Sequence, residues 1–210
     1  MGGHDKGDQN FGLIQRGDHD GPRNSSVDAH CCRFGRYGRA PDAVLLQLLM
    51  AQASPSTPIT VTADQIRLLD LSPLAPWMAL GASELLQAGA CLQLDLHWPR
   101  AEEDPRELSE IPEVRLWSLR ADATCPWLPL VLERSSGHLA RHVAMLLPHS
   151  FSRSEGLRFA PEALELWMTD RLCSAGHWAR AHDLNCRANL GQIAAVLGYE
   201  LDPSFWQALS

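Results

Sequence analysis

The sequence predicts an α+β domain, in which a small antiparallel sheet of about four strands has helices packed on one face and a C-terminal helical segment. Two observations predict this fold. Short segments in the middle of the chain alternate apolar and polar residues, most clearly over 91–98, which is the pattern of a strand with one buried face. Segments with the 3.6-residue periodicity of amphipathic helices lie on both sides of this middle part. Strands grouped together with helices at both ends favour an α+β domain.

One such domain is expected over residues 57–210, preceded by a leader and linker over residues 1–56. As far as residue 41, the leader is rich in Gly, Asp, Asn and Arg and has few consecutive apolar residues. It cannot bury enough surface to offset its chain entropy, so we expect it to be disordered. The abrupt change in composition also supports a second interpretation, in which the native protein starts at Met50 and the preceding residues are mis-assigned.

The first part of the domain is expected to hold a short strand and two helices. Residues 59–62 are β-prone, and Thr62 with Gln65 forms a capping-box pattern that predicts a helix directly after the strand. Ser72, which is followed by a proline, is a suitable N-cap for the next helix, and Gly89 would end that helix.

Four segments of the middle part are expected to form the antiparallel sheet. Residues 91–98 and 114–120 alternate apolar and polar positions. The prolines in and before residues 128–133 place that strand at an edge or a bulge. A turn at 135–137 would lead into 139–147 as a hairpin partner, although the apolar spacing of this last segment also fits a helix.

The C-terminal part is expected to be helical. Residues 148–150 end the sheet, and Pro161 stands at the start of a helix that Gly176 interrupts. Asn185 would cap a second helix, and Asp202 would start a short last one.

A strongly acidic stretch follows the clearest strand. Residues 102–113 contain six carboxylates and two prolines and run directly into an apolar segment. We expect a loop with one helical turn over 106–110, because prolines stiffen the chain and exposed carboxylates favour solvent. The stretch would present a rigid acidic surface beside the sheet.

The charge of the domain limits its partners. Residues 57–210 hold nineteen acidic residues and twelve arginines, which accounts for the whole net charge of −7. Such a surface repels nucleic-acid phosphates and anionic lipids, so we expect no nucleic-acid partner, whereas a basic protein would be steered toward it. The longest apolar run, 43–51, is far shorter than the roughly 20 residues that a membrane span needs, so no stable membrane insertion is expected.

The cysteines favour a reducing compartment. The chain has six cysteines, and its first thirty residues lack the apolar core of a secretory signal. Cys91 and Cys125 lie in apolar runs and are most simply buried thiols. A cytoplasmic protein fits these features better than a disulfide-bonded one.

A metal site is one chemical possibility. Cys173, His177, His182 and Cys186 form a C-x3-H-x4-H-x3-C string. Four ligands crowded into one helix and its end cannot easily surround a tetrahedral ion, and structural zinc usually takes pairs of ligands from two separate elements. We therefore expect scattered helix-end residues and no bound metal.

A hydrolytic site is a second possibility. Ser135 and Ser136 lie near His138 and His142, but no G-x-S-x-G elbow surrounds them. The adjacent glycine indicates a turn instead. The chain also lacks the glycine-rich motifs that bind phosphates.

Paired carboxylates are a third possibility. Glu107 and Glu110 would suit a general acid and base, or two ligands of Mg²⁺. A solvated acidic surface explains them more simply. A small metal-dependent enzyme that uses residues 102–113 stays the alternative function.

One long motif, DPRELSEIPEVRLW over residues 104–117, is specific enough to point to a family. Further motifs follow it in order, namely PWLP over 126–129, GHLAR over 137–141, MLLPH over 145–149, FAPEALE over 159–165 and GYELD over 198–202. Together they resemble the chlororespiratory reduction 6 family. The resemblance runs from about residue 59 to the C-terminus and leaves residues 1–56 outside.

The resemblance implies a non-enzymatic assembly factor of the photosynthetic NAD(P)H dehydrogenase-like complex. Such a factor helps to mature the ferredoxin-like iron–sulfur subunit I and the hydrophilic arm, in the cytoplasm of cyanobacteria or the chloroplast stroma of plant relatives. It implies no catalytic residues, no metal and no other cofactor. None of the matching motifs has the cysteine spacing of a cluster site, so we expect the protein to carry no iron–sulfur cluster itself.

The partner-binding surface is expected to combine the acidic loop with rigid apolar positions. The glutamates would face basic groups on the client, and Trp127 and the Pro148-His149 corner would supply apolar area. The expected partner-binding residues are Arg106, Glu107, Glu110, Pro112, Glu113, Arg115, Trp127, Pro129, Pro148 and His149.

Overall fold

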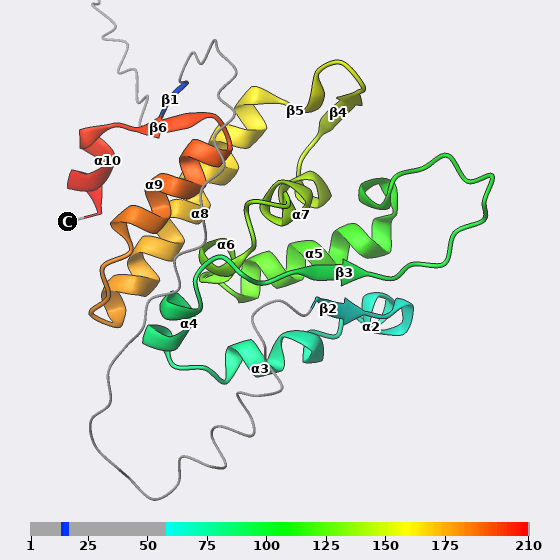
Figure 1. The fold of residues 1–210 in the computed structure, drawn as a ribbon, viewed down its shortest axis with the longest axis horizontal. Coiled ribbons are helices and arrows are strands. Elements are labelled where there is room, and N and C mark those ends of the chain that lie inside the picture. The colour runs from blue at the N-terminus through cyan, green and yellow to red at the C-terminus, as the bar shows by residue number, and fades with distance from the viewer. Residues whose placement is uncertain (1–13, 17–57, 210) are drawn as a thin grey trace, which may run out of the picture.

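The structure is a computed structural model that describes residues 14–16 and 58–209. Its elements in chain order are β1 (Ile14–Arg16), β2 (Ile59–Val61), α2 (Ala63–Arg67), the 3₁₀ turn η1 (Ser72–Leu74), α3 (Ala75–Met78), α4 (Ala82–Ala88), β3 (Leu94–Leu96), the 3₁₀ turn η2 (Leu108–Glu110), α5 (Pro112–Thr124), α6 (Leu128–Val131), α7 (His138–Leu146), β4 (His149–Ser152), β5 (Gly156–Phe159), α8 (Pro161–Ala181), α9 (Arg187–Val196), β6 (Tyr199–Leu201) and α10 (Pro203–Ala208) (Figure 1). Apart from β1, the expectation for residues 1–56 falls outside the described residues.

Within residues 14–16 and 58–209, the strands form three separate pairs instead of one sheet. β2 and β3 are parallel, with Ile59 opposite Leu94, whereas β4 and β5 form an antiparallel hairpin. β1 pairs with β6, also antiparallel. The α+β class is therefore confirmed, but the predicted sheet of about four antiparallel strands is wrong.

Helix α5 replaces the strand predicted over 114–120. Pro112 stands in its first turn, where the missing backbone N–H costs nothing. The buried residues Val114, Trp117 and Ala121 recur at helical spacing. Leu116, which shares the strand pattern with Val114, is 52% exposed. Seven residues are too few to distinguish the two-residue period of a strand from the 3.6-residue period of a helix. The preceding proline favours the helix.

The segments predicted as the third and fourth strands are the helices α6 and α7. A proline stands in the first turn of α6, and all four residues of α6 are buried. Strand-like pairing occurs just beyond it, where the Leu92 N–H donates to Val131 O at 2.8 Å and the Glu133 N–H donates to Leu92 O at 2.9 Å. In α7, Leu139, Val143 and their helical neighbours are buried, so the helical alternative for 139–147 is confirmed.

Several local predictions are confirmed. Thr62 and Gln65 form the predicted capping box directly after β2, and β3 lies inside the strand predicted over 91–98. Pro161 begins α8, as predicted. The Asp202 carboxylate accepts the Ser204 N–H at 2.8 Å and caps α10.

Three predicted helix boundaries are displaced. Gly176 does not interrupt α8 but is buried inside it. The close packing there suits glycine, since a Cβ would lie 2.9 Å from a methyl group of Leu209. Ser72 is the first residue of η1 and not its cap. The Asn185 side chain accepts the Arg187 N–H at 3.1 Å, although the residue between them occupies the N-cap position.

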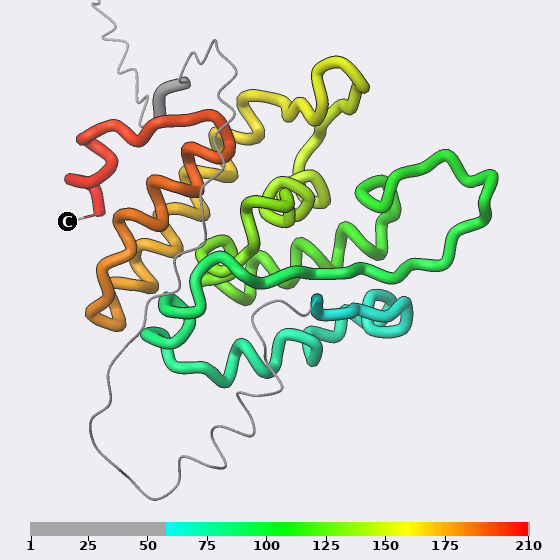
Figure 2. The backbone as a smooth tube through the Cα atoms, viewed as in Figure 1, coloured from blue at the N-terminus to red at the C-terminus, as the bar shows by residue number. Residues whose placement is uncertain are grey.

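Helix α5 packs against α2 and α7, and α8 and α9 run side by side (Figure 1). Trp117 of α5 is fully buried, and its Nε1 donates to Asp70 O at 2.7 Å, which fixes the loop after α2. At the opposite end from α10, the loop between β3 and η2 and the β4–β5 hairpin both project from the body (Figure 2).

One buried carboxylate joins three helices. The Asp122 carboxylate of α5 accepts from His142 Nε2 of α7 at 2.9 Å and from Trp167 Nε1 of α8 at 3.2 Å. Arg171 of α8 donates to the Asp122 backbone carbonyl at 2.7 Å. A charge that is buried needs such partners, so the network holds α5, α7 and α8 in one relative position.

Candidate functional site

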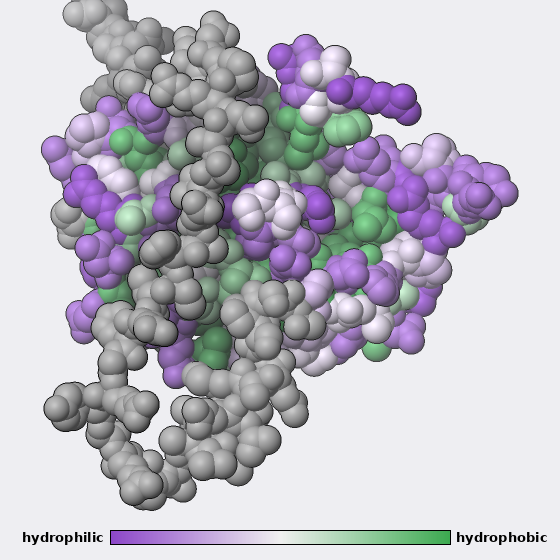
Figure 3. Space-filling model, viewed as in Figure 1, coloured by the Kyte–Doolittle hydropathy of each residue, from purple (hydrophilic) through white to green (hydrophobic). Residues whose placement is uncertain are grey.

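A groove of about 420 Å³ lies between the acidic loop, residues 102–113, and the β4–β5 hairpin. Figure 3 shows the recess between the two polar projections on the right of the molecule. Five expected partner-binding residues, Glu107, Glu110, Arg115, Pro148 and His149, line it together although they come from two separate stretches. The remaining lining residues are Pro105, Ser109, Ala144, Leu147, Ser150 and Phe151.

The acidic wall of the groove is shaped by local hydrogen bonds. The Glu110 carboxylate accepts the Glu107 N–H at 2.8 Å and so caps the η2 turn. Before it, the Asp104 carboxylate accepts from the Arg106 guanidinium at 2.7 Å. The hydrogen bonds from Arg106 lower the pKa of Asp104 to about 2. The predicted helical turn over 106–110 is therefore confirmed as η2.

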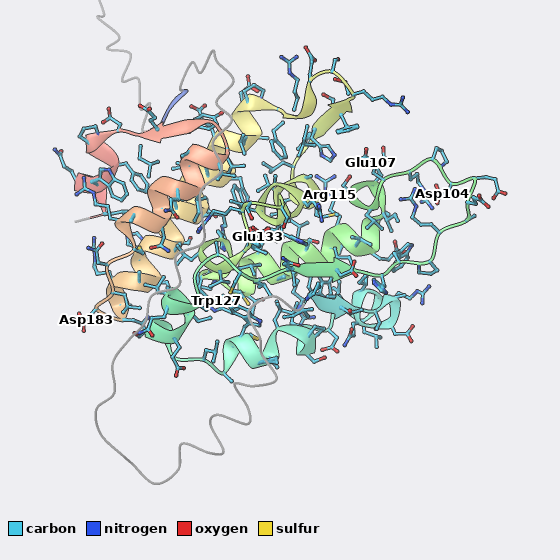
Figure 4. All side chains as sticks on the ribbon, in the orientation of Figure 1. Asp104, Glu107, Arg115, Trp127, Glu133 and Asp183 are labelled. Atoms are coloured by element: carbon cyan, nitrogen blue, oxygen red, sulfur yellow. The ribbon has the colours of Figure 1, made fainter. Side chains whose placement is uncertain are left out.

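Arg106 lies outside the groove, so its expected role as a partner contact stays a prediction. Its guanidinium is 54% exposed and is held by Asp104. It does not belong to the groove lining. Figure 4 shows Asp104 near the tip of the loop and Glu107 nearer the body of the fold.

His149 connects the two walls of the groove. Its Nδ1 lies 3.0 Å from Leu147 O, within hydrogen-bonding distance. Its Nε2 faces Glu107 Oε2 at 3.3 Å and Ser109 Oγ at 3.5 Å. The side chain is only 10% exposed, and its ring meets Phe159 edge-on with centroids 6.2 Å apart. His149 therefore positions the hairpin against the acidic loop.

Arg115 links α5 to the end of α7 beneath the groove. Its Nη2 donates to Leu146 O at 3.0 Å, where a cation also interacts favourably with the C-terminal end of a helix. Pro112 and Glu113, in the first turn of α5, are exposed but lie outside the groove lining.

Trp127 and Pro129 are not part of this surface. Trp127 is 6% exposed and Pro129 is buried in α6. Figure 4 shows Trp127 well separated from Glu107. The prediction of an exposed aromatic contact is wrong, because the prolines around Trp127 begin a buried helical turn instead of bordering an edge strand.

The serines near the histidines have a structural role. The carboxylate of Glu133 accepts the N–H of Ser135 at 2.6 Å and that of Ser136 at 2.8 Å, and it also accepts both hydroxyl groups. Burial raises the pKa of Glu133, but these hydrogen bonds outweigh it and lower the pKa to about 2. The turn interpretation of the two serines is confirmed by these contacts.

The C-x3-H-x4-H-x3-C string is dispersed. Cys173 and His177 lie within α8, whereas His182 and Cys186 follow its end and precede α9. The His182 Nδ1 contacts Trp178 O at 2.8 Å. Over residues 14–16 and 58–209, no three His, Cys, Asp or Glu side chains come together as a metal site would require.

The hairpin wall of the groove was not foreseen from the sequence. The prediction ended the sheet at residues 148–150, whereas β4 begins at His149. The signal lay just beyond, in the Ser154-Glu155-Gly156 turn and the alternation that follows it. Gly156 adopts a φ of 70°, which a side chain disfavours, and this lets the chain reverse into β5.

A second groove of about 450 Å³ lies where α8, α9 and α10 meet, at the other end of the fold. The Arg187 guanidinium stacks 4.5 Å from the centre of the Trp206 ring there. The groove contains none of the expected partner-binding residues.

Among the described helices, none combines the length and the apolar character of a membrane span.

Comparison with known proteins gives one further finding. The family model described as chlororespiratory reduction 6 matches residues 61–208, which include every element from α2 to α10. No solved structure matches the chain significantly.

Proposed function

Because the chain belongs to the chlororespiratory reduction 6 family, we propose that it is a non-enzymatic assembly factor of the photosynthetic NAD(P)H dehydrogenase-like complex. Membership of the family is consistent with a role in assembling that complex. The client in this proposal is the ferredoxin-like iron–sulfur subunit of the hydrophilic arm. The chain would hold this subunit in the cytoplasm, or in the stroma of a chloroplast, until the subunit joins the complex.

The groove supports this proposal because it brings Glu107 and Glu110 beside the hairpin on the surface of the molecule. An acidic surface steers a basic client and sets its orientation more than it adds affinity. A factor that must release its client needs selective recognition with only moderate affinity. His149 and Arg115 hold the walls of the groove through contacts inside the chain, so the surface is formed before a client arrives.

The proposal is tested by co-purification. The tagged full-length chain is expressed with the iron–sulfur subunit, and the amount of subunit captured is measured. Glu110→Arg should weaken capture strongly, because it places a positive charge in the acidic wall. Glu110→Gln should weaken capture less, since its amide oxygen can still accept the Glu107 N–H.

Glu165→Arg is the matched control. Glu165 is exposed on α8, outside the groove, so this variant makes the same change of net charge elsewhere. Equal loss of capture in Glu110→Arg and Glu165→Arg would count against the groove. No capture by the wild-type chain, together with stoichiometric Mg²⁺ binding that Glu110→Gln abolishes, would favour the metal-dependent enzyme instead.

A further inference from the structure

The backbone of β4 has one edge that faces away from its partner strand. The register places His149 opposite Phe159 and Phe151 opposite Leu157. Directly before β4, the Ala160 N–H donates to Pro148 O at 3.0 Å. Hydrogen-bonded and non-hydrogen-bonded pairs alternate along an antiparallel ladder. The backbone groups of residue 150 therefore point toward β5, and the N–H and C=O groups of His149 and Phe151 point away from it.

This outward edge borders the groove. His149, Ser150 and Phe151 all line it, and Figure 1 shows β4 on the side of the hairpin that faces the acidic loop. Within the described residues, β4 and β5 form a two-stranded sheet with no third strand. A strand edge with unpaired backbone groups is a template for another extended chain.

We propose that an extended, basic segment of a partner polypeptide occupies the groove and pairs with the free edge of β4 as a third strand. The pairing would extend over about four residues, the length of β4, or about 13 Å. Main-chain hydrogen bonds would supply affinity that does not depend on sequence, and the side chains around the edge would supply the selectivity.

The charges around the edge select a basic segment. Glu107 and Glu110 stand on the opposite wall, and the Glu107 side chain is 54% exposed. Arg115 is the one guanidinium among the lining residues, and it donates to Leu146 O. Lys or Arg side chains that project from the added strand toward the acidic wall would meet carboxylates at hydrogen-bonding range.

An aromatic side chain adds apolar area at the same edge. Phe151 is 63% exposed, although its neighbour on the same face of the hairpin, His149, is almost fully buried. The His149 ring, on the same face as Phe151, faces Glu107. Side chains of the added strand that project from this face can cover the Phe151 ring with their apolar stems and reach the carboxylates with their charged ends. A second copy of the chain is a poorer occupant, because the net charge of each copy is −7.

Hydrogen exchange with two simple probes tests the pairing itself. The full-length, ¹⁵N-labelled chain is mixed with end-blocked hexapeptides that alternate Lys with Val or Glu with Val. The Lys–Val peptide should slow exchange of the Phe151 amide, leave the Ser150 amide nearly unchanged and bind at least ten-fold more tightly than the Glu–Val peptide. Unchanged exchange at Phe151 under saturating Lys–Val peptide would overturn the proposal.

N-methylated peptides give a second readout. In an added strand, every second N–H points to β4. Of two Lys–Val peptides that carry N-methyl groups at odd or at even positions, one should lose at least ten-fold in affinity and the other should not. Equal affinities of the two peptides would rule out strand pairing.

Two substitutions at Phe151 separate the ring from the backbone. Phe151→Ala removes the ring and keeps the N–H, whereas Phe151→Pro removes both. Proline is tolerated on an edge strand where the N–H faces solvent, so both variants should melt at similar temperatures. Phe151→Pro should bind the Lys–Val peptide at least five-fold more weakly than Phe151→Ala. Equal binding would mean that this N–H is not used.

The identity of the partner rests on the proposed function, and co-purification distinguishes the two claims. If the wild-type chain, Phe151→Ala and Phe151→Pro capture the iron–sulfur subunit equally, the assembly role stands and the strand pairing fails. If the wild-type chain captures no subunit, the assembly role fails, and the peptide experiments still decide the pairing. Protection of Phe151 that rises with the concentration of the chain alone would assign the edge to a second copy and overturn the proposal.

Discussion

Asp122 and His142 are joined by a buried hydrogen bond of 2.9 Å that fastens α5 to α7, the two helices that contribute Arg115 and Ala144 to the groove. The side chains of Asp122 and His142 are 9% and 4% exposed. Trp167 Nε1 shares the same carboxylate. The position of the groove walls thus depends on a contact in the interior, which a partner on the surface cannot reach.

Asp122→Ala should lower the free energy of unfolding by about 3 kcal/mol, because it leaves His142 and the Trp167 indole buried without their acceptor. Urea denaturation followed by tryptophan fluorescence measures the change. His142→Ala should cost less than Asp122→Ala, and the double variant should cost less than the sum of the two. Glu165→Ala on the exposed face of α8 should change stability by less than about 0.5 kcal/mol. If Asp122→Ala unfolded at the same urea concentration as wild type, the Asp122 carboxylate would not hold the three helices together.

Glu133→Gln should destabilise the chain in a pH-dependent manner. The pKa of Glu133 is lowered to about 2 in the folded state from an ordinary value of 4.5. A lowered carboxyl pKa stabilises the fold fully above the unfolded pKa, and this contribution is lost as the pH falls from about 4.5 toward 2. At pH 7, Glu133→Gln should cost about 2 kcal/mol, the net value of hydrogen bonds to a charged group. In urea melts, the difference in the free energy of unfolding between Glu133→Gln and wild type should become smaller as the pH falls from 4.5 to 2.5. Glu165→Gln should show no such trend.

Local signals in the sequence predicted the ends of elements well. The capping box of Thr62 and Gln65, the proline at the start of α8 and the Asp202 cap each depend on residues three or fewer positions apart. The acidic loop and its helical turn were also foreseen, since charge and proline content act locally.

The errors arose where a pattern was short or a contact was distant. Residues 114–120 fit both a strand and a helix, and Pro112 settled the question in favour of α5. The exposure of Trp127 depends on how α6 packs against the rest of the core, which its own proline-rich surroundings do not reveal. The groove itself requires His149 to reach Glu107 across the fold, and no local pattern encodes that contact.

Two glycine-to-alanine substitutions should act in opposite directions. Gly137, at the start of α7, has a φ of 79°, whereas Gly191 lies inside α9. A Cβ at either position would meet no atom within 4 Å, so packing is equal and only the backbone differs. Gly137→Ala should cost about 1 kcal/mol because L-residues avoid positive φ, and Gly191→Ala should gain about 0.5 to 1 kcal/mol from helix propensity. Urea melts of the two variants that shift in the same direction would contradict this explanation.

Arg115→Gln should lower stability and strengthen client capture at the same time. Loss of the hydrogen bond to Leu146 O should cost about 1 kcal/mol in a urea melt. Removal of the guanidinium from a groove that also holds Glu107 and Glu110 makes the groove more acidic, so a basic client should bind several-fold more tightly at low salt. Because Debye screening weakens interactions of exposed charges, the gain should shrink in 0.5 M NaCl. Arg120→Gln, an exposed change on the same helix outside the groove, should leave capture within about two-fold of wild type. If Arg115→Gln captures less client than Arg120→Gln at low salt although both are fully folded, capture needs Arg115 itself or its bond to Leu146 O, and the client is not selected by the carboxylates alone.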